Sequence, residues 1–117
     1  MLNERQGESF ECYLELAAQH CYANSKSHGF WPEGAARNKG EQIALMHSEL
    51  SEMLEQVRKP GQKDQHCPEF TGEEIEAADV LIRLLDYCAG HNLRLGEATL
   101  AKMEFNESRP AKHGKEF

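Results

Sequence analysis

The sequence predicts an all-α protein with an antiparallel four-helix bundle-like core. Apolar residues recur at helical spacing in three stretches, polar residues do so in a fourth, and turn-forming residues separate these stretches. No stretch alternates between apolar and polar residues as a half-buried strand does. The length of 117 residues, with 39% hydrophobic and 28% charged residues, is typical of one globular domain. We therefore expect a single domain over residues 1–117, with a flexible start at 1–7 and a basic tail at 109–117.

The first helix is expected from about Ser9 to Asn24, where apolar residues recur every three or four positions. A loop at residues 25–39 follows, and it is longer than most connections between helices. It carries Phe30 and Trp31, the latter being the only tryptophan. Either these rings close one end of the core, or one of them stacks on a nucleobase.

The second helix is expected from about Gly40 to Arg58 and ends before the Pro60–Gly61 turn. A capping-box pattern, with Thr71 as N-cap and Glu74 three residues later, opens a third helix that runs to about His91. A fourth helix covers roughly 96–108 and is stopped by a proline at position 110.

Two pairs of carboxylates stand out on the second and third helices. Glu49 and Glu52 lie beside the apolar stripe of one helix, and Glu76 and Asp79 lie on a concentrated polar stripe of the other. Each pair is three residues apart, so both of its acids lie near one helix face. The four acids are either solvated charges or the ligands of a cation. Because Glu-x-x-His and HExxH motifs are both absent, an all-oxygen set favours Mg²⁺, or Mn²⁺, over iron or zinc.

The fourth helix carries polar groups that suit a phosphate. Lys102, Asn106 and Arg109 recur at spacings of four and three, which places an ammonium, an amide and a guanidinium on one side. Combined with magnesium-binding acids, they predict a site for hydrolysis of a nucleoside triphosphate without a Walker motif. The alternative is that they are helix-end charges beside the C-terminal dipole.

Three segments carry a family resemblance. Residues 41–52, 70–86 and 102–115 resemble the MazG-like nucleotide pyrophosphohydrolases of the all-α NTP pyrophosphatase superfamily, which also contains dimeric dUTPases. The family pattern EExxE, a spacer and ExxD falls on Glu49-x-x-Glu52 and Glu76-x-x-Asp79. Ser48 stands where the family has its first glutamate, which removes an auxiliary acid and leaves the four main ones.

The resemblance implies a Mg²⁺ site and an enzymatic activity. The four acids would hold Mg²⁺, Glu49 and Glu52 would be catalytic with Glu49 as the base, and Lys102, Asn106 and Arg109 would contact phosphates. Members cleave (d)NTPs to (d)NMPs and pyrophosphate, many in nucleotide-pool housecleaning. They form dimers or tetramers whose sites are shared between subunits, so a homodimer or homotetramer is expected. The resemblance also favours stacking of Phe30 or Trp31 on the base.

Charge and composition argue against several other classes of protein. A net charge of −7 argues against binding of a nucleic-acid polymer. The four cysteines show no CxxC spacing and the first residues are polar, so we expect free thiols and a cytoplasmic location. No apolar run approaches the roughly 20 residues that cross a membrane. The competing hypothesis is a non-catalytic helical module that binds a structural metal or a partner protein's basic surface.

Overall fold

The computed structural model describes residues 1–33 and 36–116, except for the side chain of His113. Gly34 and Ala35 of the expected loop, and Phe117 of the expected tail, lie outside the described residues. The all-α prediction is confirmed, because the described chain contains helices and no strand. The elements are α1 (Glu4–Ser27), α2 (Lys39–Arg58), α3 (Gly72–Gly90), α4 (Leu95–Glu107) and a short 3-10 helix, η1 (Ala111–Gly114). None of the helices in this described part has the length and apolar character that crossing a membrane requires.

Helix α1 begins earlier than the sequence pattern predicted. Asn3 is its N-cap: the Asn3 Oδ1 atom accepts from the Gln6 amide over 2.8 Å, and the Gln6 side chain accepts from the Asn3 amide over 3.0 Å. This capping box starts the helix at Glu4, so residues 4–7 of the expected flexible start are helical.

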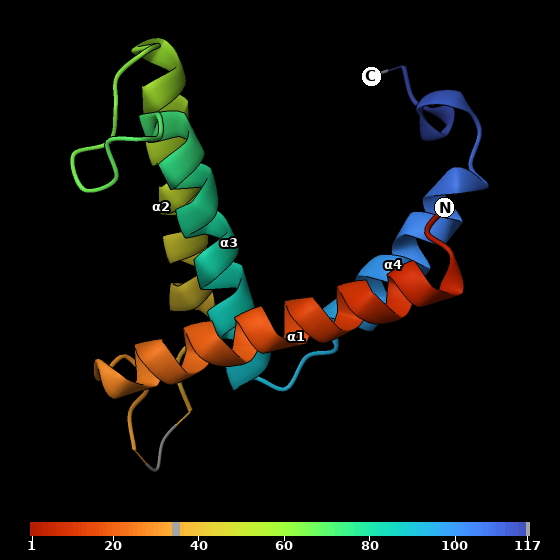
Figure 1. Cartoon of the computed structure of the whole chain (residues 1–117), viewed down its shortest axis with the longest axis horizontal. Coiled ribbons are helices and arrows are strands. Elements are labelled where there is room, and N and C mark those ends of the chain that lie inside the picture. Colours follow the sequence, from red (N-terminus) through yellow and green to blue (C-terminus); the bar gives the residue numbers. More distant parts are fainter. Residues whose placement is uncertain (34–35, 117) are drawn as a thin grey trace.

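Helices α2 and α3 form an antiparallel hairpin, seen side by side in Figure 1. The predicted capping box of α3 is confirmed, because the Glu74 amide donates to Thr71 Oγ1 over 3.1 Å and the Glu74 carboxylate accepts from the Thr71 amide. The loop before it folds back on itself, with the Asp64 amide donating to the Phe70 carbonyl over 3.0 Å. These contacts fix where α3 starts relative to the end of α2.

The expected four-helix bundle is not confirmed. Helix α1 crosses the hairpin near the end of α3, and α4 then runs antiparallel along the first half of α1, away from α2 (Figure 1). The small apolar core lies where α1 meets α3, and its buried residues are Ala18, Leu85 and Cys88. At the far end, the N-terminal ammonium pairs with Glu107 over 2.9 Å, which ties the start of the chain to the end of α4.

The single chain is unusually open for its size. Its radius of gyration is 16.8 Å, whereas a compact domain of this length has about 13 Å. Its accessible surface is 8884 Å², against about 6,500 Å² expected from its mass. Large apolar side chains on α2 and α3 are consequently about half exposed, namely Ile43, Leu50, Leu54, Val57, Leu81 and Ile82. One chain therefore leaves a broad apolar surface uncovered.

Candidate metal centre

The predicted acids of α2 and α3 converge between the two helices. One carboxylate oxygen from each of Glu49, Glu76 and Asp79 lies within 4.8 Å of the other two. Because the helices run antiparallel, the middle of α2 faces the first half of α3, which brings the two acid pairs to one level. Glu49 is buried and the other two are partly buried, so these are not solvated surface charges.

The fourth predicted acid, Glu52, lies at the rim of this cluster. Its side chain is exposed, and it is not one of the three acids whose oxygens meet. Its charge and a hydrogen bond between the two carboxyl groups nevertheless raise the pKa of Glu76, which places Glu52 beside that residue. The structure thus brings all four acids together, three of them closely.

The pKa values of two of these acids, Glu76 and Asp79, are raised. Burial, followed by the charge and hydrogen bond of Glu52 and the charges of Asp79 and Glu49, raises the pKa of Glu76 to about 7. Burial and the charge of Glu49 also raise the pKa of Asp79, with Arg83 acting in the opposite direction. Clustered carboxylates destabilise one another's charged forms, so this site favours a positive charge among them.

A buried oxygen in the cluster lacks a donor. Within the described part of the chain, no N–H or O–H group reaches Glu76 Oε2. Buried polar atoms without a partner are uncommon and often mark the place of a missing ion or water. Carboxylate oxygens are the ligands that Mg²⁺ and Mn²⁺ prefer. The residues present therefore fit a hard divalent cation.

Two charged residues at the cluster were assigned no role from the sequence. Arg83 donates through Nε to Glu49 Oε1 over 2.8 Å, and its spacing of four from Asp79 was the available signal. Asp64 lies close enough to raise the pKa of Asp79. Its Oδ2 atom accepts from the amides of His66 and Cys67, at 2.8 and 2.7 Å. Only the folding of the loop brings Asp64 here, and spacing along the chain does not reveal that.

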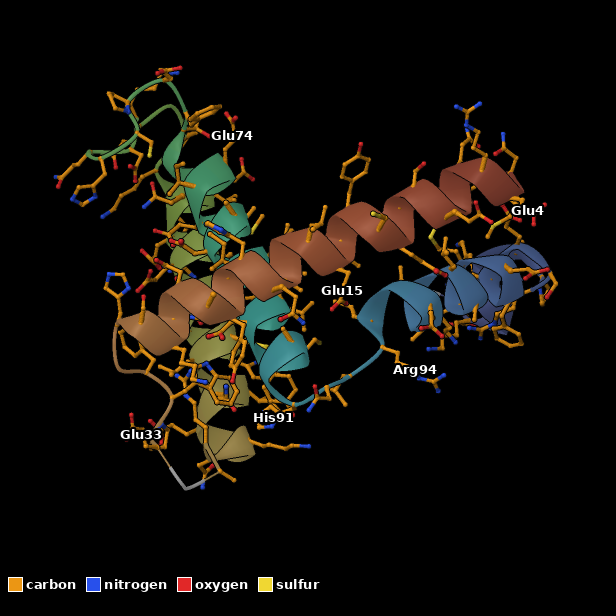
Figure 2. All side chains as sticks on the ribbon, turned by 60° about the horizontal axis from the view of Figure 1, so that its bottom comes forward. Glu4, Glu15, Glu33, Glu74, His91 and Arg94 are labelled. Carbon is orange, nitrogen blue, oxygen red and sulfur yellow. The ribbon has the colours of Figure 1, made fainter. Side chains whose placement is uncertain are left out.

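The phosphate-binding stripe predicted on α4 lies apart from the acids. Lys102 Nζ and Arg109 Cζ lie 4.6 and 5.5 Å from the centre of the Phe105 ring, so these residues do share one side. However, α4 runs along α1, well away from the acids of the hairpin (Figures 1 and 2). Asn92, with φ of 57°, and the bond from the Leu93 amide to the Cys88 carbonyl shape the turn that leads α4 away. Within one chain, these cations therefore do not reach the acids of the hairpin.

The rings of the loop before α2 differ in their surroundings. Trp31 Nε1 donates to Asp86 Oδ1 over 2.8 Å, and the indole packs edge-to-face on Tyr22 and His91. Trp31 therefore closes the end of the hairpin, which Figure 2 marks by His91, opposite the Glu74 end of α3. Phe30, in contrast, is 61% exposed. Stacking of either ring on a base stays a prediction.

Comparison with protein-family models, with curated proteins and with solved structures finds no match for this chain. The resemblance to MazG-like enzymes thus stays a prediction, and functional inference depends on the site itself.

Proposed function

We propose that this protein is a Mg²⁺-dependent nucleoside triphosphate pyrophosphohydrolase, which converts a (d)NTP to the (d)NMP and pyrophosphate. The observation that carries the proposal is the convergence of the oxygens of Glu49, Glu76 and Asp79 within 4.8 Å. The donorless Glu76 Oε2 supports it independently. The motifs that resemble MazG-like enzymes supply the reaction, with nucleotide-pool housecleaning in the cytoplasm as the role.

All four acids take part in binding the divalent ion. Glu49, Glu76 and Asp79 are the ligands, with Glu52 joining them from the rim, since all four lie together between α2 and α3. Mg²⁺, or Mn²⁺ in its place, neutralises phosphate charge and makes water a better nucleophile. Of the two acids expected to be catalytic, Glu52 is the more exposed and Glu49 the more enclosed.

The phosphate-binding groups come from a second copy of the chain. Lys102 and Asn106 of α4 line one hollow, and Arg109 just beyond the helix shares the Phe105 ring with Lys102. This end of the chain lies away from the acids of its own hairpin. Asn106 Oδ1 is buried and no donor in the described residues reaches it. In a homodimer or homotetramer, α4 of one subunit can meet the hairpin of another, and lysine and arginine there would bind phosphate oxygens.

The uncovered surface has the size that such an assembly needs. The chain exposes about 2,400 Å² more than a compact protein of its mass, and subunits of permanent dimers bury 2,000 Å² or more in total. On α2, one apolar stripe is about half exposed along its length, and its members are Ile43, Leu50, Leu54 and Val57. Burial of this stripe against a second copy would drive association.

Phe30 is the better candidate for stacking on the base. Trp31 is held by Asp86 and enclosed by two aromatic rings. The Phe30 ring is largely exposed. Arg37 Cζ lies 5.9 Å from the centre of this ring and 5.4 Å from that of Trp31, so exposure is what distinguishes Phe30. A ring beside a guanidinium suits an aromatic ligand that carries negative charge. We therefore assign stacking to Phe30 and support of the loop to Trp31.

Release of pyrophosphate from a panel of dNTPs and NTPs, with Mg²⁺ or Mn²⁺, tests the activity. We expect the wild-type protein to turn over at least one nucleotide. The rate of pyrophosphate release should fall by at least about 100-fold in Asp79→Asn and in Glu52→Gln. Glu55→Gln is the matched control, since Glu55 is an exposed acid of α2 that pairs with Arg58. Absence of turnover across the panel, or full activity in Asp79→Asn, would refute the enzyme assignment.

Subunit mixing tests the shared site. Asp79→Asn and Arg109→Gln are each expected to be inactive, yet a mixed oligomer contains a site with neither change. Coexpression should restore roughly a quarter of the wild-type activity, as expected for random pairing in a dimer with shared sites. Activity that stays at the level of the separate variants would mean that acids and cations of one subunit act together or not at all.

One observation favours the competing module without catalysis. Arg83 already supplies the cluster with a positive charge through Glu49, at 2.8 Å, so the acids have a partner within the chain. A structural metal or a basic protein surface could satisfy the remaining charge. In that case the acids would bind a cation tightly while no nucleotide is turned over.

A further inference from the structure

An arginine on α3 reaches across the hairpin to the acid cluster. Arg83 Nε donates to Glu49 Oε1 over 2.8 Å, and Arg83 lies one helical turn beyond Asp79. The Glu49 side chain is 11% exposed and that of Arg83 is 37% exposed, so the carboxylate is the inner partner of the pair. The bond therefore joins the two helices that supply the acids, at the level where the acids meet.

This bond occupies one oxygen of Glu49 and leaves the second oxygen for another partner. A carboxylate has about four acceptor positions on its two oxygens, so a hydrogen bond to one oxygen does not block coordination through the other. It does restrict rotation of the side chain. Residues that hold a metal ligand in this way contribute strongly to metal binding, and their removal lowers the affinity for the metal about 10–100-fold.

We propose that Arg83 is a positioning residue that orients Glu49 toward Glu76 and Asp79, so that their three carboxylates bind one divalent cation. The inference rests on the metal-binding part of the proposed function and not on the reaction. The opposite role makes the opposite prediction. If Arg83 acted only through its charge, it would repel a cation, and its removal would tighten binding.

Three substitutions of Arg83 separate the effect of its hydrogen bond from that of its charge. Arg83→Met keeps the side chain as far as the position of Nε and removes every donor. Arg83→Gln places an uncharged N–H at the same number of bonds from the backbone as Nε, and Arg83→Lys keeps the charge and a donor of sufficient reach. Arg58→Met is the matched control, since Arg58 forms an exposed pair with Glu55 on the same hairpin.

Binding of Mn²⁺ to the metal-free full-length protein, followed by the electron paramagnetic resonance signal of free Mn²⁺, tests the proposal without turnover. We expect affinity about 10-fold or more below wild type in Arg83→Met, within about threefold of wild type in Arg83→Gln and Arg83→Lys, and unchanged in Arg58→Met. Circular dichroism would check that each variant keeps its helices, and Arg83→Leu replaces Arg83→Met if the latter does not fold.

Two results would overturn the proposal alone. One is Mn²⁺ binding by Arg83→Met that equals or exceeds that of wild type. The other is an Arg83→Gln variant that binds Mn²⁺ as weakly as Arg83→Met, because a donor restored at the position of Nε would then not support binding. Failure of the wild-type protein to bind Mn²⁺ would overturn this inference and the metal site together. Binding without nucleotide turnover would refute only the proposed reaction.

Discussion

The six-membered ring of Trp31 occupies the space where a side chain on Gly90 would lie. Gly90 is the last residue of α3, and Trp31 approaches it from the loop that leads into α2. The indole also donates to Asp86 one turn earlier on α3. The loop is thus attached to the end of the hairpin by a ring that fits only over glycine.

Gly90→Ala should destabilise the protein. A Cβ atom at this position would overlap the Trp31 ring, so the ring must shift or the helix end must move. Overpacking of this kind costs about 1–3 kcal/mol in the free energy of unfolding. Urea denaturation followed by circular dichroism would measure it.

Gly7→Ala is the matched control for that experiment. Gly7 lies inside α1, and a Cβ there would meet only Leu100 Cδ1, at an ordinary contact distance of 3.6 Å. Alanine in a helix interior stabilises by roughly 0.5–1 kcal/mol relative to glycine. A destabilised Gly7→Ala, or an unaffected Gly90→Ala, would contradict the packing described for this corner.

Trp31→Phe should also destabilise the protein, through a different cause. The variant keeps an aromatic ring but removes the donor to Asp86, which is buried and otherwise pairs with Arg37 over 3.5 Å. Loss of a hydrogen bond to a buried charged group costs about 1–3 kcal/mol in the free energy of unfolding.

Phe30→Leu changes a ring that is 61% exposed, so it should change stability little and should instead raise the KM for the nucleotide. Thermal denaturation and steady-state kinetics of both variants would separate the two roles.

Local signals in the sequence predicted the helices but not their arrangement. Thr71 and Glu74 marked the start of α3 because a capping box depends only on residues three apart. Asn3 and Gln6 form the same motif at the start of α1, but polar first residues suit a frayed end equally well, so the sequence does not distinguish the two. The acid pairs converged as expected, since adjacent antiparallel helices place their polar faces together. The path of α4 depends on the turn at Asn92 and on contacts with α1, which helical periodicity does not encode.

Without metal, the contribution of Glu76 to the stability of the folded protein should decrease as the pH rises toward 7. Its pKa is about 7 in the folded protein and 4.5 ordinarily, so between these values the folded state binds more protons than the unfolded state. The stabilisation is present below about pH 4.5 and is lost as pH rises through 7. Melting temperatures in a chelator, from pH 5 to 8, should therefore fall more steeply in wild type than in Glu76→Gln.

The comparison of the two proteins is needed because His91 acts in the opposite direction. Burial and the charges of Lys39 and Arg37 lower the pKa of His91, so its contribution to stability increases with pH. That contribution is common to wild type and Glu76→Gln and cancels in their difference. A difference that does not change between pH 5 and 8 would rule out the raised pKa of Glu76.

Divalent metal should stabilise the folded protein. A cation that binds only the folded state adds about 2.7 kcal/mol at 100 times its dissociation constant. We expect millimolar Mg²⁺ or Mn²⁺ to raise the melting temperature by several degrees, and a chelator to reverse this. Asp79→Asn should abolish the shift, whereas Glu55→Gln should retain it, because Glu55 lies outside the cluster. An equal shift in both variants would show that the metal acts elsewhere.

A charge placed in the apolar stripe of α2 should break the assembly. Leu54 is 53% exposed in one chain and lies on the same helix face as Ile43, Leu50 and Val57. Leu54→Glu would place a charge in the buried interface of a homodimer or homotetramer, where an unpaired carboxylate is strongly unfavourable. Sedimentation equilibrium should then give the monomer mass for Leu54→Glu and a multiple of it for wild type.

Ala44→Glu is the matched control. It adds the same charge to an exposed position about 100° away from this stripe on the helix, and the variant should remain assembled. If wild type sediments as a monomer, the shared site is excluded, because the cations of α4 would have no acids to face.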